Sequence, residues 1–476
     1  MLFWSSVVFG IIYFILIVIT IGIVMLDNHQ PSESVAWIAL IVALPILGPL
    51  LYYFFGQNIR RSRLLEKRSL DLLTRKGMAK YVQQAHNLRP QEGDMPMLRF
   101  FKRHNMSLPF DKNQGEFLTQ GSDFLGRLLH DIDAARHHVH LEFFIFLDDG
   151  VGTQVADALA RAAGRGVRVR LIYDDMGCWK VPNRFWHDLR RKGIQAVPFM
   201  PVRFPAVAHR INYRNHRKLV VIDGRLAYIG GMNIAQRYVD GMDGRPWRDL
   251  MMRLTSGGCI YGIQMLFLAD WYMATHEIVD QSEYYPSEAT AAGEGALGQI
   301  VFSAPISKWP VIMMGYQKII LSARKSLLIQ SPYLIPTVQI RDALQTASMS
   351  GVRIQIMIPQ YPDSRWLRWA NNSYVGDMLK AGAEVYLYKP GMMHAKMLLA
   401  DDHLLSIGSV NMDARSMLST FESSAVFYDD QLAQRARELF MEARAQCTKI
   451  DIQQWRQRKL HHRLTESFVR IFTPLL

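Results

Sequence analysis

The stretch His216-Arg-Lys-Leu-Val-Val-Ile-Asp223 leads into Gly230-Gly-Met-Asn233, and the same order returns as His394-Ala-Lys-Met-Leu-Leu-Ala-Asp401 ahead of Gly408-Ser-Val-Asn411. The His, Lys, Gly and Asn positions all recur at one offset of 178 residues. Alternate residues of a β-strand share a face, so the His and Lys of each copy point the same way. The apolar residues between Lys and Asp continue each strand into a core. Each copy is therefore predicted to present a His–Lys pair at the start of a buried strand.

The duplication extends beyond these two stretches. The apolar run at 139–146 corresponds to the run at 327–334, and the run at 166–173 corresponds to that at 351–358. Short β-branched runs that alternate with helical stretches are typical of an α/β sheet, and the offset is far too long for a solenoid repeat. The sequence predicts two related α/β halves, joined by a linker at 282–298 that is rich in Ala, Gly, Glu and Ser.

The repeated polar residues suit phosphate chemistry if the two halves pack about a pseudo-twofold axis. Lysine and asparagine side chains offer charge and hydrogen-bond donors to the non-bridging oxygens of a phosphate. Two histidines with ordinary pKa values near ~6.5 can divide the roles of nucleophile and general acid at neutral pH. No carboxylate cluster with Mg²⁺ spacing accompanies them, which favours metal-free phosphodiester chemistry. The run His137-His-x-His140 is not expected to bind a metal, because only two of its histidines would share a strand face.

The amino-acid composition and net charge of the chain limit the kinds of molecule that it is expected to bind. The chain has 476 residues, a net charge of +13 and 49% hydrophobic residues, which excludes wholesale disorder. Its three cysteines are widely separated and exclude a disulfide scaffold or a Cys-rich zinc site. The positive charge favours an anionic partner: nucleic acid, a lipid headgroup or a phosphate-bearing substrate.

Two apolar stretches at the amino terminus favour the membrane. Leu2 to Leu26 is 25 residues without a charged side chain, and Val35 to Phe55 is a second uncharged stretch of 21 residues. About 20 apolar residues are enough for a helix to cross a bilayer, so we expect a transmembrane hairpin. Basic residues crowd at 60–68, just after the second stretch, and the positive-inside rule then places the rest of the chain in the cytoplasm. A cleaved signal peptide is disfavoured, because a basic leader and an Ala-x-Ala site are missing.

At the motifs quoted above, the chain resembles the phospholipase D superfamily, whose signature is two HxKxxxxD motifs. With the paired amino-terminal stretches and the ending Thr473-Pro-Leu-Leu476, it is similar to the bacterial cardiolipin synthases of the two-span type. The resemblance implies an α/β fold: a duplicated phospholipase D-like domain with two mixed β-sheets flanked by helices, plus the hairpin. It implies conversion of two phosphatidylglycerol molecules to cardiolipin and glycerol at the bacterial inner membrane. The implied partners are phosphatidylglycerol and anionic membrane lipid, with no cofactor, no required metal and no nucleic acid; a homo-oligomer is compatible with it.

The resemblance also implies roles for individual residues. One histidine attacks phosphorus to form a phosphatidyl-histidine, and the other protonates the departing glycerol; by analogy these are His216 and His394, in an order that the sequence leaves open. The motif aspartates belong to the catalytic signature, but their place at strand ends favours a structural, ion-pairing role. The remaining site residues are Lys218, Lys396, Asn233 and Asn411 for phosphate oxygens, Asp249 and Glu422 to orient the histidines, and Asp223 and Asp401 as the motif aspartates.

Two other functions stay open at this point. A phospholipase D that releases phosphatidic acid would have the same motifs with water as the acceptor. A membrane-tethered nuclease or nucleic-acid-binding protein would exploit the positive charge, although no RNP, helix-turn-helix or zinc pattern is present.

The segment at 451–476 is predicted to be a basic amphipathic tail that lies on the membrane or packs on the catalytic body. The predicted regions are a hairpin at 1–58, a basic linker at 59–105, halves at 106–281 and 299–450, the linker at 282–298 and the tail.

Overall fold

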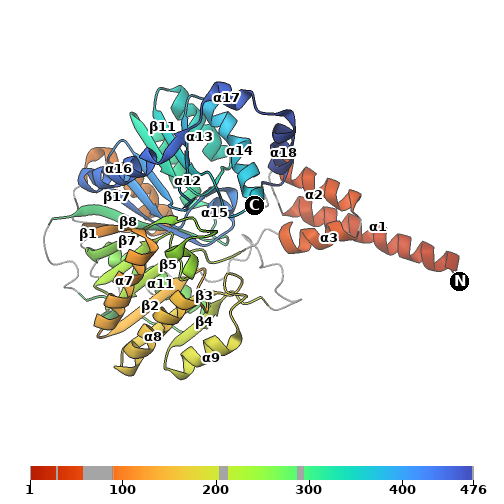
Figure 1. Ribbon diagram of the computed structural model, residues 1–476. Coiled ribbons are helices and arrows are strands. Elements are labelled where there is room, and N and C mark those ends of the chain that lie inside the picture. The colour runs from red at the N-terminus through yellow and green to blue at the C-terminus, as the bar shows by residue number, and fades with distance from the viewer. Residues whose placement is uncertain are drawn as a thin grey trace.

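The central feature of the fold is one mixed sheet of 16 strands that runs through both halves of the chain (Figure 1). The structure is a computed structural model and describes residues 2–27, 31–44, 46–56, 88, 90–202, 213–286 and 294–473.

The first half alternates strands and helices, as its apolar runs predict. Every residue of β2 (His138–Phe143) is buried, the pattern of a strand covered on both faces. β2 pairs in parallel with β3 (Arg168–Asp174) and antiparallel with β5 (Lys218–Ile222), which carries the first motif. The other elements of this half are β1 (Pro109–Gln120), α7 (Gly121–Ala134), α8 (Gly150–Gly164), α9 (Asn183–Arg191), β4 (Gln195–Phe199), β6 (Leu226–Gly230), α10 (Gln236–Asp240), β7 (Trp247–Ser256) and α11 (Cys259–Thr275).

The second half repeats this arrangement. β9 (Ser326–Gln330) pairs in parallel with β11 (Arg353–Pro359) and antiparallel with β14 (Met397–Ala400), which carries the second motif. The expected linker contains a 3₁₀ turn, Ser282–Tyr284, and the start of β8. The other elements are β8 (Ala296–Ser303), α12 (Val311–Ser322), β10 (Leu334–Ile335), α13 (Val338–Met349), α14 (Arg365–Lys380), β12 (Glu384–Tyr388), β13 (Met392–Met393), β15 (Leu404–Gly408), β16 (Met412–Asp413), α15 (Ala414–Leu418), β17 (Glu422–Tyr428), α16 (Asp430–Ala445) and β18 (Cys447–Lys449).

Two pairs of strands join the halves within the sheet: β1 with β8, and β13 with β7. The order is β4-β3-β2-β5-β6-β7-β1 in the first half and β12-β11-β9-β14-β15-β17-β8 in the second, so each strand has a counterpart at the same place. β1 and β8 are counterparts, and they pair antiparallel, with Pro109 opposite Gln299. An antiparallel pair of counterpart strands is what a pseudo-twofold relation predicts. The two expected sheets are therefore joined edge to edge into one.

The hydrophobic core also crosses this seam. Helix α11 is apolar on nearly all sides and contacts β5 and β8, one strand from each half; a helix of that kind belongs inside a core. The cluster around it joins Leu219 and Ile229 to Ile300 and Leu328. Two further clusters fill the space beneath α7 and α8 and beneath α12, α13 and α14. The halves thus share a core, which fixes the position of one motif strand against the other half.

The amino-terminal helices differ from the expected hairpin. α1 spans Leu2–Leu26, but the second expected stretch is divided into α2 (Pro31–Ala43), α3 (Leu47–Leu51) and a π-turn at Tyr52–Gly56. The Tyr52 hydroxyl donates to Asp27 at 2.6 Å and its ring contacts Trp37, so the chain folds back toward the end of α1. Prolines at 45 and 49 lack the amide hydrogen that a continuous helix needs. Among the residues whose side chains the structure describes, no helix is long and apolar enough to cross a membrane.

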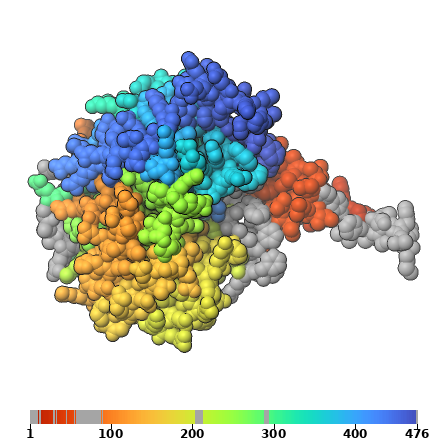
Figure 2. All heavy atoms as spheres, in the orientation of Figure 1, coloured from red at the N-terminus to blue at the C-terminus, as the bar shows by residue number. Residues whose placement is uncertain are grey.

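Short elements complete the two ends of the body. The basic linker lies mostly outside the described residues, and it ends in a 3₁₀ turn and a helix that packs against β8. At the carboxyl end, the predicted basic tail forms two helices, the second of which packs on α14. Figure 2 shows the amino-terminal helices on the same side of the body as this carboxyl end. These elements are the 3₁₀ turn Glu92–Asp94, α6 (Met95–Asn105), α17 (Ile452–Arg456) and α18 (Leu460–Ile471).

Candidate active site

Each motif histidine lies two or three residues before its strand. Its backbone amide bonds to a carbonyl of the other half. The His216 amide donates to the carbonyl of Phe421 at 2.9 Å, and the His394 amide donates to that of Arg248 at 2.7 Å. His216 therefore sits beside the start of β17, and His394 beside the start of β7. These crossed backbone contacts bring the two motifs together at the seam.

The carboxylates that orient the histidines are exchanged between the halves. The Nδ1 atom of His216 lies 3.0 Å from Glu422 of the second half, and Nδ1 of His394 lies 2.5 Å from Asp249 of the first. Lys396 Nζ is also 2.7 Å from Nδ1 of His394. One ring nitrogen cannot donate to a carboxylate and accept from an ammonium at once, so we assign the Nδ1 proton to Asp249 because charge-assisted donation is the stronger interaction. In both histidines Nε2 is then left with a lone pair.

Glu422 is held by a set of hydroxyl groups that the sequence did not single out. Thr420 donates to one carboxylate oxygen at 2.8 Å, and Ser409 donates to the other. Ser409 occupies the second position of the Gly-Ser-Val-Asn motif, where the first copy has Gly231. A side chain at Gly231 would meet the Asp249 carboxylate. Glycine at 231 therefore leaves room for the Asp249 carboxylate, whereas Ser409 fits beside Glu422 and bonds to it.

The site is buried, and burial decides its protonation states. Burial lowers the pKa of His216 to about 4 and that of His394 to about 3, against the opposing attraction of the neighbouring carboxylate. Burial alone would raise the pKa of Glu422, but His216 and Lys218 hold it below its usual value. At neutral pH both imidazoles are therefore neutral and both carboxylates ionised.

The motif lysines supply the positive charge. The ammonium of Lys218 donates to the His216 carbonyl at 2.5 Å, and that of Lys396 donates to the His394 carbonyl. Burial lowers the pKa of Lys218 to about 7 and that of Lys396 to about 8. Each lysine interacts electrostatically with the histidine of the other half, so both ammoniums serve a single site.

The two motif asparagines differ in how far they are available to a ligand. Asn233 accepts from the Ile145 amide at 3.1 Å and donates to the Tyr238 hydroxyl, so most of its hydrogen-bonding capacity is used within the protein. Asn411 lines the cavity described below, and its side-chain oxygen has no partner among the described residues. The predicted phosphate contact is therefore more accessible to Asn411 than to Asn233.

The motif aspartates lie at the far ends of their strands, away from the histidines. The Asp223 carboxylate accepts the backbone amides of Arg136, His137 and His138 at 2.8–2.9 Å. Asp401 accepts the corresponding amides of residues 324–326 at 2.7–2.9 Å. The expectation of a structural role fits this geometry, but the partners are backbone amides and not the expected ion pairs. Both aspartates have positive φ, which short polar side chains tolerate best.

A cavity of about 450 Å³ opens at the first motif. His216, Glu422 and Asn411 line it together with apolar side chains of both halves. The His216 side chain is 16% exposed and that of His394 is 8% exposed, so His216 is the more accessible histidine. The sequence at 201–210 mixes apolar and basic residues ahead of the first motif, and it falls largely outside the described residues. Lining residues that the sequence did not single out are Phe144, Ile335, Asp413, Arg214 and Arg415.

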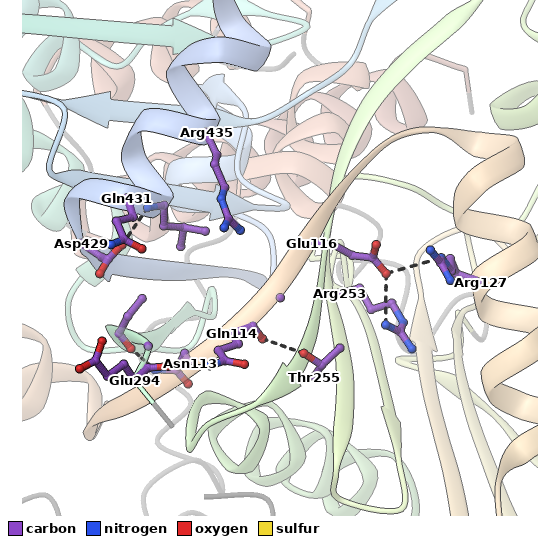
Figure 3. Close-up of a pocket in the computed structure, with 14 residues that line it drawn as sticks. Asn113, Gln114, Glu116, Arg127, Arg253, Thr255, Glu294, Asp429, Gln431 and Arg435 are labelled. Atoms are coloured by element: carbon purple, nitrogen blue, oxygen red, sulfur yellow. Dashed lines mark hydrogen bonds and ion pairs between the residues drawn. The ribbon is translucent and has the colours of Figure 1, made fainter. Parts of the chain in front are cut away.

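A second cavity, of about 680 Å³, lies beside β1 (Figure 3). It is lined by the middle of β1, the end of β7 and the start of α16, and it contains neither motif. Its charges balance, with Glu116, Glu294 and Asp429 against three arginines. Glu116 pairs with two of these, Arg127 and Arg253. This cavity therefore does not present the cationic surface that a phosphodiester requires.

The histidines at 137–140 are engaged with protein groups. The side chain of Gln264 bridges His138 and His140, at 3.1 and 2.9 Å, and Arg170 contacts His140 at 3.2 Å. In the part of the chain that the structure describes, no group of three or more His, Cys, Asp or Glu side chains could hold a metal ion.

Behind His216, a buried arginine connects the two halves. The Arg217 guanidinium donates to the carbonyls of Glu422 and Ser303 in the second half, at 3.2 and 3.0 Å, and pairs with Asp270 in the first. Glu142 packs against this pair and accepts from Asn215; burial and Asp270 raise the pKa of Glu142 well above its usual value. In the second motif, an alanine occupies the position of Arg217.

We expect Arg217→Met to lower the free energy of unfolding by about 3–5 kcal/mol, because it leaves Asp270 buried without its counter-charge. Denaturant unfolding of the detergent-solubilised protein measures this loss. The double variant Arg217→Met/Asp270→Asn is the matched control and should recover much of the stability. An equal loss in both variants would show that the arginine contributes through packing alone.

The chain is similar to known proteins both in sequence and in fold. A family model described as "Cardiolipin synthase, PLD-like domain" matches residues 128–271 and 316–444, and one described as "Phospholipase_D-nuclease N-terminal" matches residues 11–57. The chain is 35% identical to the major cardiolipin synthase of Bacillus subtilis, over 99% of both chains. It is 34% identical to cardiolipin synthase 2 of Bacillus anthracis, over 95% of this chain and 89% of that protein. The crystal structure of phosphatidylserine synthase from Haemophilus influenzae superposes with a TM-score of 0.59 at 16% identity, over 80% of this chain and 98% of that one, which shows the shared fold.

Proposed function

The chain belongs to the cardiolipin synthase family of phospholipase D-type enzymes, and on that premise we propose that it joins two phosphatidylglycerol molecules into cardiolipin and glycerol through a phosphatidyl-histidine. The observation that carries this proposal is the pair of motif histidines at one seam, each with a carboxylate of the other half 2.5–3.0 Å from Nδ1, which leaves Nε2 of both rings for the reaction. Such a pair supplies one nucleophile and one proton carrier without a cofactor.

In the first step, Nε2 of His216 attacks the phosphorus of phosphatidylglycerol. Binding of the anionic phosphodiester raises the pKa of His394, and Nε2 of His394 takes up a proton from solvent. The bond from phosphorus to the glycerol headgroup oxygen then breaks, and His394 delivers this proton to that oxygen. Lys218, Lys396 and Asn411 hold the non-bridging oxygens, where negative charge accumulates in the transition state.

In the second step, a headgroup hydroxyl of another phosphatidylglycerol gives its proton to Nε2 of His394 and attacks the same phosphorus. The phosphorus–nitrogen bond breaks, and His216 returns to its neutral state. The apolar wall of the cavity, formed by Phe144, Tyr333, Ile335 and Leu367, favours a lipid acceptor over water. This is the reason to prefer a synthase to a hydrolase that releases phosphatidic acid.

We further propose that the amino-terminal segment anchors the protein at the bacterial inner membrane, with the catalytic body in the cytoplasm. The uncharged stretch at residues 2–26 and the basic residues at 60–68 support this assignment. The fold-back at Tyr52 suggests that the second stretch enters the membrane without crossing it. Cysteine accessibility at Ser34 in intact spheroplasts tests the topology: labelling from outside supports two spans, and protection supports the fold-back.

The function itself is tested with purified protein in detergent micelles that contain phosphatidylglycerol as the only lipid, with EDTA present. Mass spectrometry of the products should show cardiolipin and glycerol. Phosphatidic acid as the only product would make the protein a hydrolase. If no lipid product forms, while DNA is bound in a salt-dependent manner, the nucleic-acid alternative would replace the proposal.

The protonation states predict an unusual pH profile for kcat/KM with a phosphatidyl ester of p-nitrophenol, whose leaving group needs no proton from His394. His216 must be unprotonated to attack, and since its pKa in the free enzyme is about 4, activity should persist well below pH 6.5 and fall only as the pH approaches 4. On the alkaline side, activity should fall between about pH 7 and 8, where the lysines lose their charge. Initial rates in micelles from pH 4 to 9 measure both limbs. Lys218→Arg should move the start of the alkaline limb from about pH 7 toward about pH 8, whereas an acid limb near pH 6.5 would contradict the buried neutral histidine.

A further inference from the structure

Helix α18 is attached to the catalytic body along one face. Val469 is fully buried there, and Glu466 accepts from Arg458 at 2.6 Å. The Arg470 guanidinium pairs with Asp377 of α14 at 2.7 Å and donates to the carbonyl of Ser373 at 2.9 Å. These contacts fix the rotation of α18 about its axis, and so determine which side chains face outward.

The outward face of α18 is apolar and uncovered. Its large side chains recur at the spacing of one helical stripe, and their exposed fractions lie between 42% and 71%. Leaving such a stripe in water is unfavourable, because burial of each of these side chains contributes about 1.5–3 kcal/mol of favourable free energy. The stripe consists of Leu460, Leu464, Phe468, Ile471 and Phe472.

Basic residues border this stripe. Lys459 and Arg463 flank its first turns and have no ion pair among the described residues, and Arg456 lies just before them on α17. The two acidic side chains of the tail face away from this stripe: Glu466 faces inward to Arg458, and Asp451 caps α17. A continuous apolar stripe with cationic borders is the pattern of a helix in a membrane interface, where the apolar side chains enter the acyl boundary and the cations meet anionic headgroups.

The same helix that holds α18 also forms part of the active-site cavity. The first turn of α14 contributes Trp366 and Leu367 to the cavity wall, and Trp366 is 51% exposed. Its last turns bind Arg470 of α18. One rigid helix therefore connects the apolar stripe to the cavity. Helix α18 lies on the side of the body from which the amino-terminal helices project (Figures 1 and 2).

We propose that the outward face of α18 lies in the interface of an anionic bilayer and forms a second membrane contact that turns the active-site cavity toward its lipid substrate. The inference rests on the proposed function in one respect only, that the substrate resides in the bilayer. A protein partner is disfavoured because the cations surround the apolar stripe on its borders, as the headgroup layer requires, and no acidic group lies among them.

A site-specific fluorophore tests the position of the helix in the full-length protein. Phe468→Cys, in a Cys447→Ser background, places one reactive thiol on the stripe, since Cys178 and Cys259 are buried. An environment-sensitive dye at this position, in proteoliposomes of phosphatidylglycerol and phosphatidylcholine, should shift its emission to shorter wavelength and be quenched by spin-labelled lipid. Met349→Cys is the matched control, because Met349 is 79% exposed at the end of α13 and should report water.

Three outcomes are distinguishable. Quenching by spin-labelled lipid at Phe468 alone supports the proposal. A dye that is quenched by aqueous iodide, or that is shielded from both quenchers by protein, overturns it.

A second measurement separates this inference from the proposed function. The double variant Leu464→Gln/Phe468→Gln should lose roughly tenfold or more of its turnover in bilayers, as expected for the loss of two interfacial apolar anchors, and should keep its turnover in micelles. Equal activity in both media would overturn the role of α18, whereas inactivity of the unmodified protein in micelles would count against the proposed function instead.

Discussion

Replacing His216 with alanine is expected to abolish the formation of cardiolipin, with a loss of about 10⁴-fold or more, because it removes the proposed nucleophile and with it the covalent intermediate. Replacing His394 with alanine should cost about 10²–10⁴-fold, the usual contribution of a general acid. The two losses differ in kind, since one removes the nucleophile and the other removes the proton that the leaving group needs.

A substrate with a better leaving group separates these two roles. In a phosphatidyl ester of p-nitrophenol the leaving group departs without protonation, so His394→Ala should release p-nitrophenol in the first turnover at a rate near that of the unmodified enzyme. Later turnovers should be slow, because His394 is also the base of the second step. His216→Ala should remain inactive toward this ester. Quenching during turnover with denaturant at alkaline pH, where the phosphorus–nitrogen bond is stable, should trap the phosphatidyl group on a peptide that contains His216. If His394→Ala stays inactive and His216→Ala is rescued, the roles of the two histidines are reversed.

Replacing Glu422 with glutamine is expected to reduce kcat by about 10³–10⁴-fold, although the side chain keeps its size. The carboxylate holds the Nδ1 proton of His216 and stabilises positive charge on the ring during attack; an amide can present its NH₂ to Nδ1 and force the proton onto Nε2, the atom that must attack. Asp249→Asn should act in the same way on His394. The p-nitrophenyl ester shows which histidine each variant impairs. It should restore the first-turnover release of p-nitrophenol in Asp249→Asn but not in Glu422→Gln.

The matched control for this experiment is Ser409→Ala. It removes one hydrogen bond to Glu422 but leaves the carboxylate charged, so a loss of about tenfold is expected. A loss from Ser409→Ala as large as that from Glu422→Gln would mean that the position of the carboxylate, and not its charge, is what catalysis requires. Thermal unfolding of each variant shows whether the fold is retained.

Much of the site could be predicted from the sequence because its residues lie within short, repeated motifs. The strands β2, β3, β9 and β11 carry apolar runs that only a buried strand explains, and the constant offset between the motifs indicates a common fold for the two halves. The Asp249 and Glu422 carboxylates could be named from the resemblance. The partner of each could not be derived from spacing, because the contacts cross between halves that are about 200 residues apart in the sequence.

Other features depend on tertiary contacts that local patterns do not encode. The antiparallel pairing of β1 with β8 joins two strands with little apolar alternation, so neither was singled out. The role of Asp223 as an acceptor of three backbone amides requires the position of a loop far away in sequence. The second apolar stretch at the amino terminus satisfied the length for a span, but tertiary contacts of Tyr52 with Asp27 and Trp37 favour a fold-back over a continuous helix.

The exchange of carboxylates between the halves also constrains when the enzyme can become active. A ribosome completes residue 216 long before residue 422, so a growing chain carries the first histidine without the acceptor that activates it. A chain that terminates early, or is cut by a protease between the halves and loses its second part, keeps a nucleophile that cannot work. Lipid cleavage by incomplete polypeptides is thereby avoided, and only a chain that has been made to its end and has closed its seam can act on the membrane.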